Sequence, residues 1–467
     1  MRRTTRRQLL RGALAAGPGV AWARHASARQ LNDQLRLAVV GFHGQGRLHI
    51  RLLNELPGVR VAALCDADRA VLERQVEEFR KRKEKVDGYV DVRKLLEDPD
   101  IDAVTTATPD HWHALVTIWA CQAGKDVYVE KPLCHNLWEG RKMVEAARKY
   151  ERVVQFGNQS HGHRTGPMRL ELGQLGRIQV AFTCLNRLRR SIGKVDGPQP
   201  VPESVDYNLW TGPAPLEPLM RRRLHYDWHW VWPTGTGEIG NNGIYPLDAA
   251  RLALGQSALP KRVMSLGGRF LFNDDGQTPN AQIALFQYDP GPMIIFELRN
   301  FPSDKGPKTV GPKLKCEGGE AGLPSPTGKP GPTGGFSAHK GHLFNFVSVV
   351  RSRQTSQLRA DVLEGHLSTA LVHMANISYR LGTPHSVDEA RHAIQDWGPE
   401  AVEIFGRFRE HLEANGVDFS KAQMVLGPWL EMDPKTEQFV RPTEVADRAN
   451  SLARGDYRKP FVVPETV

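Results

Sequence analysis

The sequence predicts an α/β protein with two domains: a doubly wound parallel sheet, then a domain built on a large, mostly antiparallel sheet. Three observations lead to this prediction. The 467 residues exceed a single ordinary core. Between residues 35 and 159, short apolar runs alternate with helical stretches. Between residues 177 and 300, longer strand-like runs follow one another with turns between them.

Five strands with helices between them make up the first domain, which we expect over residues 34–159. Each strand is a short apolar run; the runs are 35–42, 59–66, 101–109, 126–132 and 152–159. One helical stretch ends at Gly124, and another opens with Asn136 and Glu139 at capping-box spacing. Strands separated by helices need crossover connections, so we expect a parallel sheet covered on both faces.

The second domain, expected over residues 160–384, begins with strand-like runs joined by turns and by no helices. These runs are 177–188, 262–272, 281–289 and 292–300. The Gly-, Pro- and Lys-rich stretch from 302 to 336 predicts a long irregular loop. Helical patterns follow at 339–353 and 360–382, and the tail, 385–467, is expected to hold one more helix and an extended end.

The net charge of +10 at first suggests an acidic partner such as nucleic acid. Residues 1–28, however, hold six arginines and no acidic residue, so the rest of the chain carries only +4. No later run of Lys and Arg is interleaved with aromatic residues, which argues against nucleic-acid binding. The five cysteines show no paired spacing, and no His and carboxylate group has metal-ligand spacing, so we expect neither a disulfide framework nor a metal site.

Residues 1–28 have the layout of a cleavable export signal. A charged start is followed by a modest apolar stretch and by the small residues Ala26, Ser27 and Ala28. The apolar stretch is too short for a membrane span, so we expect no stable membrane insertion. The segment around Arg6 and Arg7 resembles the twin-arginine signal, which implies export of a folded protein to the periplasm. A disordered basic tail is the alternative.

A glycine-rich turn follows the first strand and precedes a helix, which is the context of a phosphate-binding turn. The G-x-G-x-x-G spacing is imperfect, because Gly41 and Gly46 fit while His43 takes the middle position and Gly44 follows it. Asp66 ends the second strand at the distance where a carboxylate binds a ribose 2′-OH and repels a 2′-phosphate. The sequence therefore predicts a dinucleotide site that takes NAD in preference to NADP. A plain structural turn is the alternative.

Polar residues end the third and fourth strands, at the edge where open parallel sheets bind ligands. Thr108, Pro109 and His113 follow the third strand, and Glu130 and Lys131 end the fourth. An ammonium in a partly dry cleft can lower its pKa and move a proton to or from an alcohol. Lys131 is therefore a catalytic candidate, although a surface lysine paired with Glu130 would leave the same pattern.

These motifs resemble a known family. The glycine-rich turn, the acid after the second strand, T-P-x-x-x-H and G-K-x-V-x-x-E-K-P are similar to the glucose–fructose oxidoreductase/inositol dehydrogenase (Gfo/Idh/MocA) family. "LWTGPAP", "WHWVW" and "EGHLSTALVHMANISYRLG" resemble its exported bacterial branch. The resemblance, from about residue 35 to 440, implies a Rossmann domain followed by an α/β domain with an open sheet. It also implies NAD(H) or NADP(H), a sugar, cyclitol or related polyol as substrate, and a homo-oligomer formed through the C-terminal sheet.

The resemblance also implies a cofactor role for each matching residue. The expected cofactor-binding residues are Gly41, Phe42, His43, Gly44, Gln45 and Gly46 at the pyrophosphate, Asp66 at the adenosine ribose, Thr108, Pro109 and His113 along the cofactor, and Glu130 and Lys131 on the nicotinamide side.

The stretch "GEIGNNGIYPLD", residues 237–248, is expected to form a wall of the site. In the family this segment carries an aspartate and, four residues later, a histidine, which form the proton-transfer group with the E-K-P lysine. Asn241 and Tyr245 occupy those positions here. A phenol titrates at about 10, so Tyr245 can act as a base only if a cation such as Lys131 stabilises its anion. The alternative is that the site retains binding and has lost proton transfer.

The aromatic segment "HYDWHWVW" supplies further candidates. His225, Asp227 and His229 are embedded among tryptophans, a composition suited to stacking on sugar faces. We take His229 as a fourth catalytic candidate beside Lys131, Asn241 and Tyr245. A buried aromatic cluster under a loop is the alternative.

Three functions remain open. The main prediction is an NAD(P)-dependent oxidoreductase that transfers hydride to or from a carbohydrate-like substrate. The second is a redox-neutral glycosidase- or epimerase-like enzyme with retained NAD, which export favours because soluble NAD is not expected outside the cytoplasm. The third is a non-catalytic binding protein with a dinucleotide fold, motivated by Asn241 and Tyr245.

We expect a fusion of residues 1–28 to a reporter to stay in the cytoplasm when Arg6→Lys and Arg7→Lys are introduced together. The paired guanidinium groups are the feature that distinguishes this signal from a general secretory one. Cell fractionation measures the distribution, with the unmutated fusion as the exported control. Unchanged export of the double variant through the general secretory route would rule out the twin-arginine interpretation.

Overall fold

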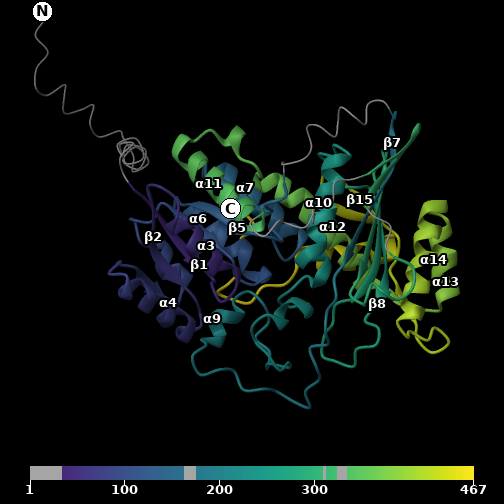
Figure 1. Cartoon of the computed structure of the whole chain (residues 1–467), viewed down its shortest axis with the longest axis horizontal. Coiled ribbons are helices and arrows are strands. Elements are labelled where there is room, and N and C mark those ends of the chain that lie inside the picture. Colours follow the sequence, from purple (N-terminus) through teal and green to yellow (C-terminus); the bar gives the residue numbers. More distant parts are fainter. Residues whose placement is uncertain (1–33, 162–174, 309–311, 323–333) are drawn as a thin grey trace, which may run out of the picture.

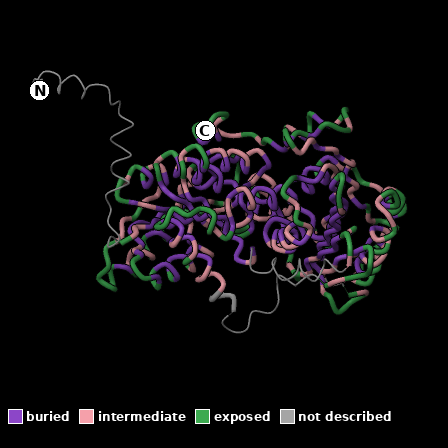
Figure 2. The backbone as a smooth tube through the Cα atoms, turned by 90° about the horizontal axis from the view of Figure 1, so that it is seen from above, coloured by how far each residue is buried: buried purple, intermediate pink, exposed green. Residues whose placement is uncertain are grey.

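The computed structural model describes residues 34–161, 175–308, 312–322 and 334–467, and it contains two sheets surrounded by helices (Figure 1). The expected signal, residues 1–28, lies outside these ranges. Purple buried segments run through both halves and through the region between them, so the two sheets share a continuous interior (Figure 2).

The first sheet confirms the predicted doubly wound fold. Its six strands are all parallel and lie in the order β3-β2-β1-β4-β5-β6. The strands are β1 Leu35–Val40, β2 Val59–Cys65, β3 Asp87–Tyr89, β4 Ala103–Thr106, β5 Asp126–Glu130 and β6 Val154–Gly157. The associated helices are α3 Gln45–Asn54, α4 Arg69–Lys81, α5 Val92–Leu96, η1 Asp110–Trp112, α6 His113–Gln122 and α7 Leu137–Lys149. β3 was not expected, because its three residues contain no apolar run.

Only one of the two hydrogen bonds of the predicted capping box of α7 is formed. The Asn136 side chain accepts the Glu139 N–H at 2.9 Å, as expected. The Glu139 carboxylate, however, accepts the His135 N–H at 2.8 Å, one residue before the cap. The helix start is therefore fixed by both side chains, which satisfy backbone donors that the helix itself leaves unpaired.

The second sheet is mostly antiparallel, as predicted, with β7 and β10 as a parallel pair. Its main path is β12-β11-β7-β10-β9-β8-β14-β13, with β15 and β16 attached through β8. The strands are β7 Ile178–Asn186, β8 Arg262–Gly268, β9 Ala281–Gln287, β10 Met293–Arg299, β11 Lys313–Cys316, β12 Gly319–Gly322, β13 Thr383–His385, β14 Met424–Leu426, β15 Leu430–Asp433 and β16 Gln438–Arg441.

Three sequence expectations for this half are wrong. Helices do occur between β7 and β8, namely α9 Tyr207–Thr211, η2 Asp227–Trp230, the π-helical turn η3 Ile239–Gly243 and α10 Ile244–Ala253. Within the stretch expected to be irregular, residues 313–322 form the β11–β12 hairpin. The tail holds three helices, α13 Val387–Gln395, α14 Pro399–Ala414 and α15 Thr443–Arg454, where one was expected. α10 is buried almost all round, so it lacks the amphipathic period that reveals a surface helix.

Helices cover both faces of the second sheet. α10 and α12 (Val362–Leu381) pack on the face toward the first domain. α13 and α14 lie on the other face in Figure 1, where their apolar side chains bury strand residues such as Phe182, Leu285 and Ile295. This face of the sheet is therefore covered by the chain itself. The homo-oligomer through the C-terminal sheet stays a prediction.

One helix from the second half of the chain belongs to the first core. α11, Gly334–Ser352, contributes Leu343, Phe346 and Val350 to the cluster that surrounds β1 and α3. Figure 1 shows α11 above the first sheet, far from β7 and β8. The chain thus crosses between the two sheets more than once, and short-range sequence patterns do not reveal this return. η4, Thr355–Gln357, follows it.

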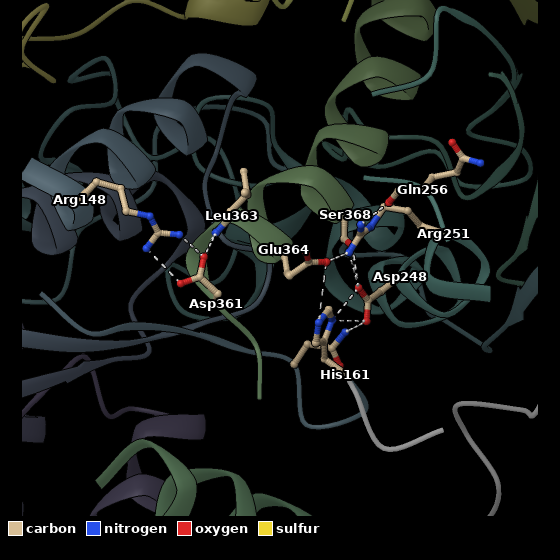
Figure 3. Close-up of polar contacts among 10 residues, drawn as sticks. Arg148, His161, Asp248, Arg251, Gln256, Asp361, Leu363, Glu364 and Ser368 are labelled. Carbon is tan, nitrogen blue, oxygen red and sulfur yellow. Dashed lines mark hydrogen bonds and ion pairs between the residues drawn. The ribbon is translucent and has the colours of Figure 1, made fainter. Parts of the chain in front are cut away.

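A buried polar network ties α10 to its surroundings (Figure 3). The Asp248 carboxylate on α10 accepts from Ser368 Oγ at 2.6 Å and contacts His161 Nδ1 at 3.0 Å. It also accepts from Asn158 Nδ2 at 2.8 Å. Arg251, one turn along α10, donates to Ser368 and to the Glu364 carboxylate. These contacts join α10, α12 and the loop after β6, because each buried charge needs a partner.

We expect His161→Gln to lower the free energy of unfolding by about 2–3 kcal/mol near pH 6. Burial alone would lower the pKa of His161, but pairing with Asp248 outweighs it and raises the pKa above 6.5. The pair therefore contributes fully below about pH 6.5, the value of an unfolded histidine, and its contribution is lost as pH rises through the raised pKa.

Urea unfolding of the unmutated protein and of the His161→Gln variant, near pH 6 and near pH 9, measures this difference in the free energy of unfolding. The half-exposed His385, which lies 3.7 Å from Glu389, supplies the control variant His385→Gln, with little expected change. An equal loss from His161→Gln at both pH values would show that packing, and not the ion pair, accounts for the effect.

Candidate active site

A cleft of about 490 Å³ lies at the carboxyl edge of the first sheet. It opens where β1 and β4 are neighbours, the point at which α3 and α6 leave to opposite faces of the sheet. Ligands of doubly wound sheets bind at this switch point. The opposite wall comes from residues 209–245 of the second half. The structure thus brings the dinucleotide turn and the "GEIGNNGIYPLD" stretch into one cavity.

Most of the predicted site residues line this cleft. They are Gly41, His43, Gly44, Gln45, Asp66, Thr108, Pro109, His113, Glu130, Lys131, His229, Asn241 and Tyr245. Phe42 and Gly46 do not. The Phe42 side chain points into the core beneath the turn, so only its backbone can contact a cofactor, and its cofactor role stays a prediction. Its N–H remains part of the turn.

The turn after β1 requires glycine at two positions. Gly41 has φ +72°, and a Cβ there would lie 2.8 Å from Thr108. A Cβ on Gly46 would lie 2.2 Å from the Gly41 carbonyl oxygen. At Gly44, the N-cap of α3, a Cβ would meet nothing within 4 Å. The backbone is therefore tightly closed on itself but open toward the cleft at the helix N-terminus, as a pyrophosphate site needs.

Asp66 joins the first two turns. Its carboxylate accepts the Phe42 N–H and the Asp68 N–H, both at 3.0 Å. Burial raises the pKa of Asp66, while these two hydrogen bonds oppose the rise. The carboxylate lines the cleft within reach of a ligand that lies across the turn. Its position is the one at which a ribose hydroxyl can donate to it.

Glu130 is a buried anion held by neighbouring donors. Its Oε1 lies 3.0 Å from His49 Nε2 and 3.3 Å from Gln45 Nε2, and its Oε2 accepts the Lys131 N–H at 3.1 Å. Burial alone would raise the pKa of Glu130, but the His49 hydrogen bond and nearby cations lower it to about 2. Glu130 is therefore ionised throughout the physiological range, and it fixes α3 against the end of β5.

Lys131 reaches across the cleft to the opposite wall. Its Nζ donates to the Asn241 backbone oxygen at 2.8 Å and to Asn241 Oδ1 at 3.2 Å. The Lys131–Pro132 peptide bond is cis. Burial lowers the pKa of Lys131, although Glu130, Asp110 and Glu238 oppose that shift. A partly desolvated ammonium can therefore release its proton more readily than a surface lysine.

Tyr245 lies beside Lys131 without a hydrogen bond to it. The Lys131 Nζ is 5.7 Å from the centre of the Tyr245 ring, which is a cation–π distance. Burial, with a contribution from Glu130, raises the pKa of Tyr245 well above that of a free phenol. The phenol therefore stays protonated at neutral pH. It can donate a hydrogen bond to a substrate, but it is not poised to accept a proton as a phenolate would be.

The wall that carries Asn241 is anchored by a buried ion pair. Arg189 donates to both Glu238 oxygens at 2.8 Å. Asn242 Nδ2 donates to the same carboxylate at 2.7 Å, and Asn241 Nδ2 lies 3.4 Å from it. Bidentate pairs of this kind fix geometry as well as charge. They hold η3 in the position from which Asn241 meets Lys131.

His229 offers a free acceptor to the cleft. Its Nδ1 lies 2.5 Å from the Tyr226 backbone oxygen, so it must carry the proton, and Nε2 is left with a lone pair. The ring stacks on Trp228 with centroids 3.6 Å apart. Burial lowers the pKa of His229 to about 3, so the imidazole is neutral. The residue thus suits hydrogen-bond acceptance from a hydroxyl.

The other members of the aromatic segment have different surroundings. His225 stacks on His43 at 4.2 Å and lies 3.0 Å from the Asp68 carboxylate, so it connects the two walls of the cleft. Asp227 is buried and paired with Arg223 away from the cleft. Among the described lining residues, the segment therefore contributes His225, Tyr226, Trp228 and His229. The backbone of Tyr226 is left-handed, with φ +69°.

His113 holds two loops together. Its ring nitrogens lie 2.8 Å from the Pro132 carbonyl oxygen and 3.0 Å from the Thr108 carbonyl oxygen. The side chain is buried, and burial lowers its pKa. His113 therefore connects the turn after β4 to the E-K-P turn and also lines the cleft.

Sequence reasoning missed two acidic residues that line the cleft, Asp91 and Asp110, of which Asp110 is the more deeply buried. Asp110 follows Thr108 and Pro109 directly, so the T-P-D sequence could have indicated it. Its carboxylate is buried, lines the cleft and accepts from Thr236 Oγ1 at 2.7 Å. Burial raises the pKa of Asp110 to about 7. It is a carboxyl group that can change its charge near neutral pH.

Neither a metal cluster nor a membrane span is found in the described ranges. No three His, Cys, Asp or Glu side chains among those residues are grouped so that they could hold a metal ion. None of the helices described has the length and apolar composition to cross a membrane. The expectation of no metal therefore stays a prediction for the chain as a whole.

Named relatives align with about a quarter of the chain. The α-N-acetylgalactosaminidase of Shewanella oneidensis is 31% identical over 125 residues, which are 26% of this chain and 27% of that protein. A glycosyl hydrolase family 109 protein of Shewanella baltica is 32% identical over 125 residues, with the same shares. The chain thus matches about a quarter of the length of these curated relatives.

Solved structures match over a larger share. The myo-inositol dehydrogenase from Lactobacillus casei, in complex with NAD(H) and myo-inositol, is 19% identical with a TM-score of 0.54, and the match covers 74% of this chain and 94% of that one. The WlbA dehydrogenase from Bordetella pertussis, in complex with NADH and UDP-GlcNAcA, is 17% identical with a TM-score of 0.55 and shares of 74% and 97%. These likenesses show the fold.

Family models match both halves of the chain. Residues 35–158 match the model described as the oxidoreductase family, NAD-binding Rossmann fold. Residues 183–405 match the model described as the oxidoreductase family, C-terminal alpha/beta domain. Together with the six-stranded sheet and its glycine-rich turn, these matches show that the chain belongs to the Gfo/Idh/MocA oxidoreductase family, with an NAD-binding Rossmann domain at its N-terminal end.

Proposed function

We propose that this protein is an NAD-dependent oxidoreductase that moves hydride to or from a carbon of a sugar, cyclitol or related polyol. The observation that supports the proposal is that one cleft holds both the dinucleotide site and the acid–base candidates. It joins the dinucleotide turn and Asp66 to Lys131, which can deprotonate a hydroxyl, and to Tyr245 and His229, which can hydrogen-bond to one.

The residues present suit a bound dinucleotide. The N-terminus of α3 opens onto the cleft at Gly44, where the donors of an unfinished helical turn would hold the pyrophosphate. The Asp66 carboxylate would hold the adenosine ribose. When bound, the nicotinamide supplies a two-electron acceptor and donor for hydride. Glu130 and Lys131 mark the end of the cleft where that ring would lie.

The chain's own residues would handle the proton. The Lys131 amine, with its pKa lowered by burial, can take the proton of a substrate hydroxyl at Nζ. The neutral Tyr245 phenol can donate to the oxygen on which charge develops. His229 Nε2 can accept a hydrogen bond from a neighbouring hydroxyl of the substrate and so orient the substrate ring. With these roles, Tyr245 does not have to form a phenolate.

A redox-neutral cycle is the second candidate. The relatives named α-N-acetylgalactosaminidase and glycosyl hydrolase family 109 protein favour it, although they align with only a quarter of the chain. In such a cycle a sugar carbon is oxidised, a glycosidic bond is cleaved, and the hydride returns. The twin-arginine-like segment supports the same candidate, because an exported protein would have to regenerate a retained cofactor in place. We therefore propose export to the periplasm as part of it.

Two measurements test the proposal. A mass spectrum of the denatured, purified protein should contain about one NAD per chain, or NAD should bind on titration. The loaded protein is then assayed on inositols, sugars and glycosides, N-acetylgalactosaminides included. Net NADH formation supports the oxidoreductase, and glycoside cleavage without NADH supports the redox-neutral cycle. A protein that neither contains nor binds a nucleotide would instead be the non-catalytic form.

Asp66→Ala should weaken NAD binding by about tenfold or more and change NADP binding much less. The variant removes the acceptor for the ribose hydroxyls and, with it, the repulsion of a 2′-phosphate. Calorimetric titration with both nucleotides measures the change. Asp91→Asn is the matched control, because Asp91 also lines the cleft but is paired with Arg93. The assignment is wrong if the unmutated protein already binds NADP more tightly.

Lys131→Met should lower turnover by about a hundredfold or more, the usual range for a lost acid–base group. Tyr245→Phe should also lower turnover but leave the pH dependence in place, since the neutral phenol donates a hydrogen bond and does not titrate. Steady-state rates across pH on a verified substrate measure both. If Tyr245→Phe keeps full activity, Tyr245 contributes packing only. If Lys131→Met keeps it, the proton has another acceptor.

A further inference from the structure

We propose that Asp110 is a catalytic residue that replaces the carboxylate missing at Asn241 and accepts the substrate's proton after Lys131. This inference rests on the proposed function. The family's plan places an aspartate at position 241, and this chain has an amide there that cannot take up a proton. Asp110 supplies a carboxylate to the same cleft from a different element, the turn after β4.

The position of Asp110 supports the assignment. Asp110 and Lys131 line one cleft and influence each other electrostatically. Only 2% of Asp110 is exposed, so bulk water does not compete strongly for its proton. Among the described groups, Glu139 and Cys134 also interact electrostatically with Asp110, and Lys131 is the positively charged one of the three.

Thr236 fixes the carboxylate and connects it to the opposite wall. Thr236 Oγ1 donates to Asp110 Oδ2 at 2.7 Å. A Cβ on Gly240 would lie 1.9 Å from that same Oγ1, so glycine at 240 lets η3 pack directly against Thr236. Asn376 Nδ2 holds the Thr236 carbonyl at 2.9 Å. Asp110 is therefore held against the segment that also carries Asn241, the partner of Lys131.

The proton step balances without a further reactant. The substrate O–H bond breaks and an N–H bond forms at Lys131 Nζ. One N–H bond of that ammonium then breaks, and the proton passes through water in the cleft to the Asp110 carboxylate, where an O–H bond forms. The electron pair of the substrate C–H bond leaves as the hydride of the proposed function. In the reverse direction Asp110 returns the proton, which a redox-neutral cycle also requires. The pKa of Asp110, raised by burial to about 7, suits transfer in both directions.

A binding experiment tests this role without a substrate. NAD⁺ and NADH differ by the positive charge of the nicotinamide, and a positive charge near Asp110 favours its carboxylate. At neutral pH the protein should release more protons on binding NAD⁺ than on binding NADH. Calorimetry in two buffers of different ionisation enthalpy measures this difference. Asp110→Asn should abolish most of it while both nucleotides still bind. Glu139→Gln, which alters another buried carboxyl group outside the cleft lining, should keep it.

Turnover on a verified substrate gives the second readout. Asp110→Asn should lower kcat by about a hundredfold and remove the acidic limb of the pH profile. Thr236→Val, which removes a donor to the carboxylate, should shift that limb to higher pH. If Asp110→Asn leaves proton release and the pH profile unchanged, Asp110 is only structural. If neither nucleotide binds to the unmutated protein, the proposed function itself fails.

Discussion

The arrangement of the cleft depends on one buried carboxylate, that of Asp248. It accepts from Asn158 and Ser368 and pairs with His161, so a single side chain joins the loop after β6, α10 and α12 (Figure 3). A buried carboxylate is costly unless each of its lone pairs is used, and this requirement leaves few alternative positions for α10. Because α10 continues directly from η3, the same pairing positions Asn241 and Tyr245 above the first domain.

Within the cleft, burial determines which groups carry charge. Glu130 stays anionic because His49 pairs with it. Tyr245 and His229 stay neutral because burial opposes their charged forms. With an amide at 241, Lys131 has a neutral hydrogen-bond partner at that position, and burial lowers its pKa. These pKa shifts support the proposal that Lys131 and Asp110 move the proton, while Tyr245 only donates a hydrogen bond.

One face of the second sheet is covered by helices from the C-terminal part of the same chain. Residues 387–414 form α13 and α14, whose apolar side chains cover the face of the sheet that lies away from the first domain. Burying an apolar sheet face is a strong requirement, which either a second copy or an added helical pair can meet. The tail reinforces this closure, because β15 pairs with β8 and α15 packs on α12.

The sequence by itself determined the local elements of this protein. The strand runs, the turn with Gly41, the acid Asp66 and the E-K-P lysine were all predictable, because each follows from a short period or from backbone geometry over a few residues. Tertiary structure decided the rest. Asp110 meets Thr236 from 126 positions away, and His161 meets Asp248 from 87. The state of a buried charge depends on such distant partners, and no local pattern records which side chains will surround it.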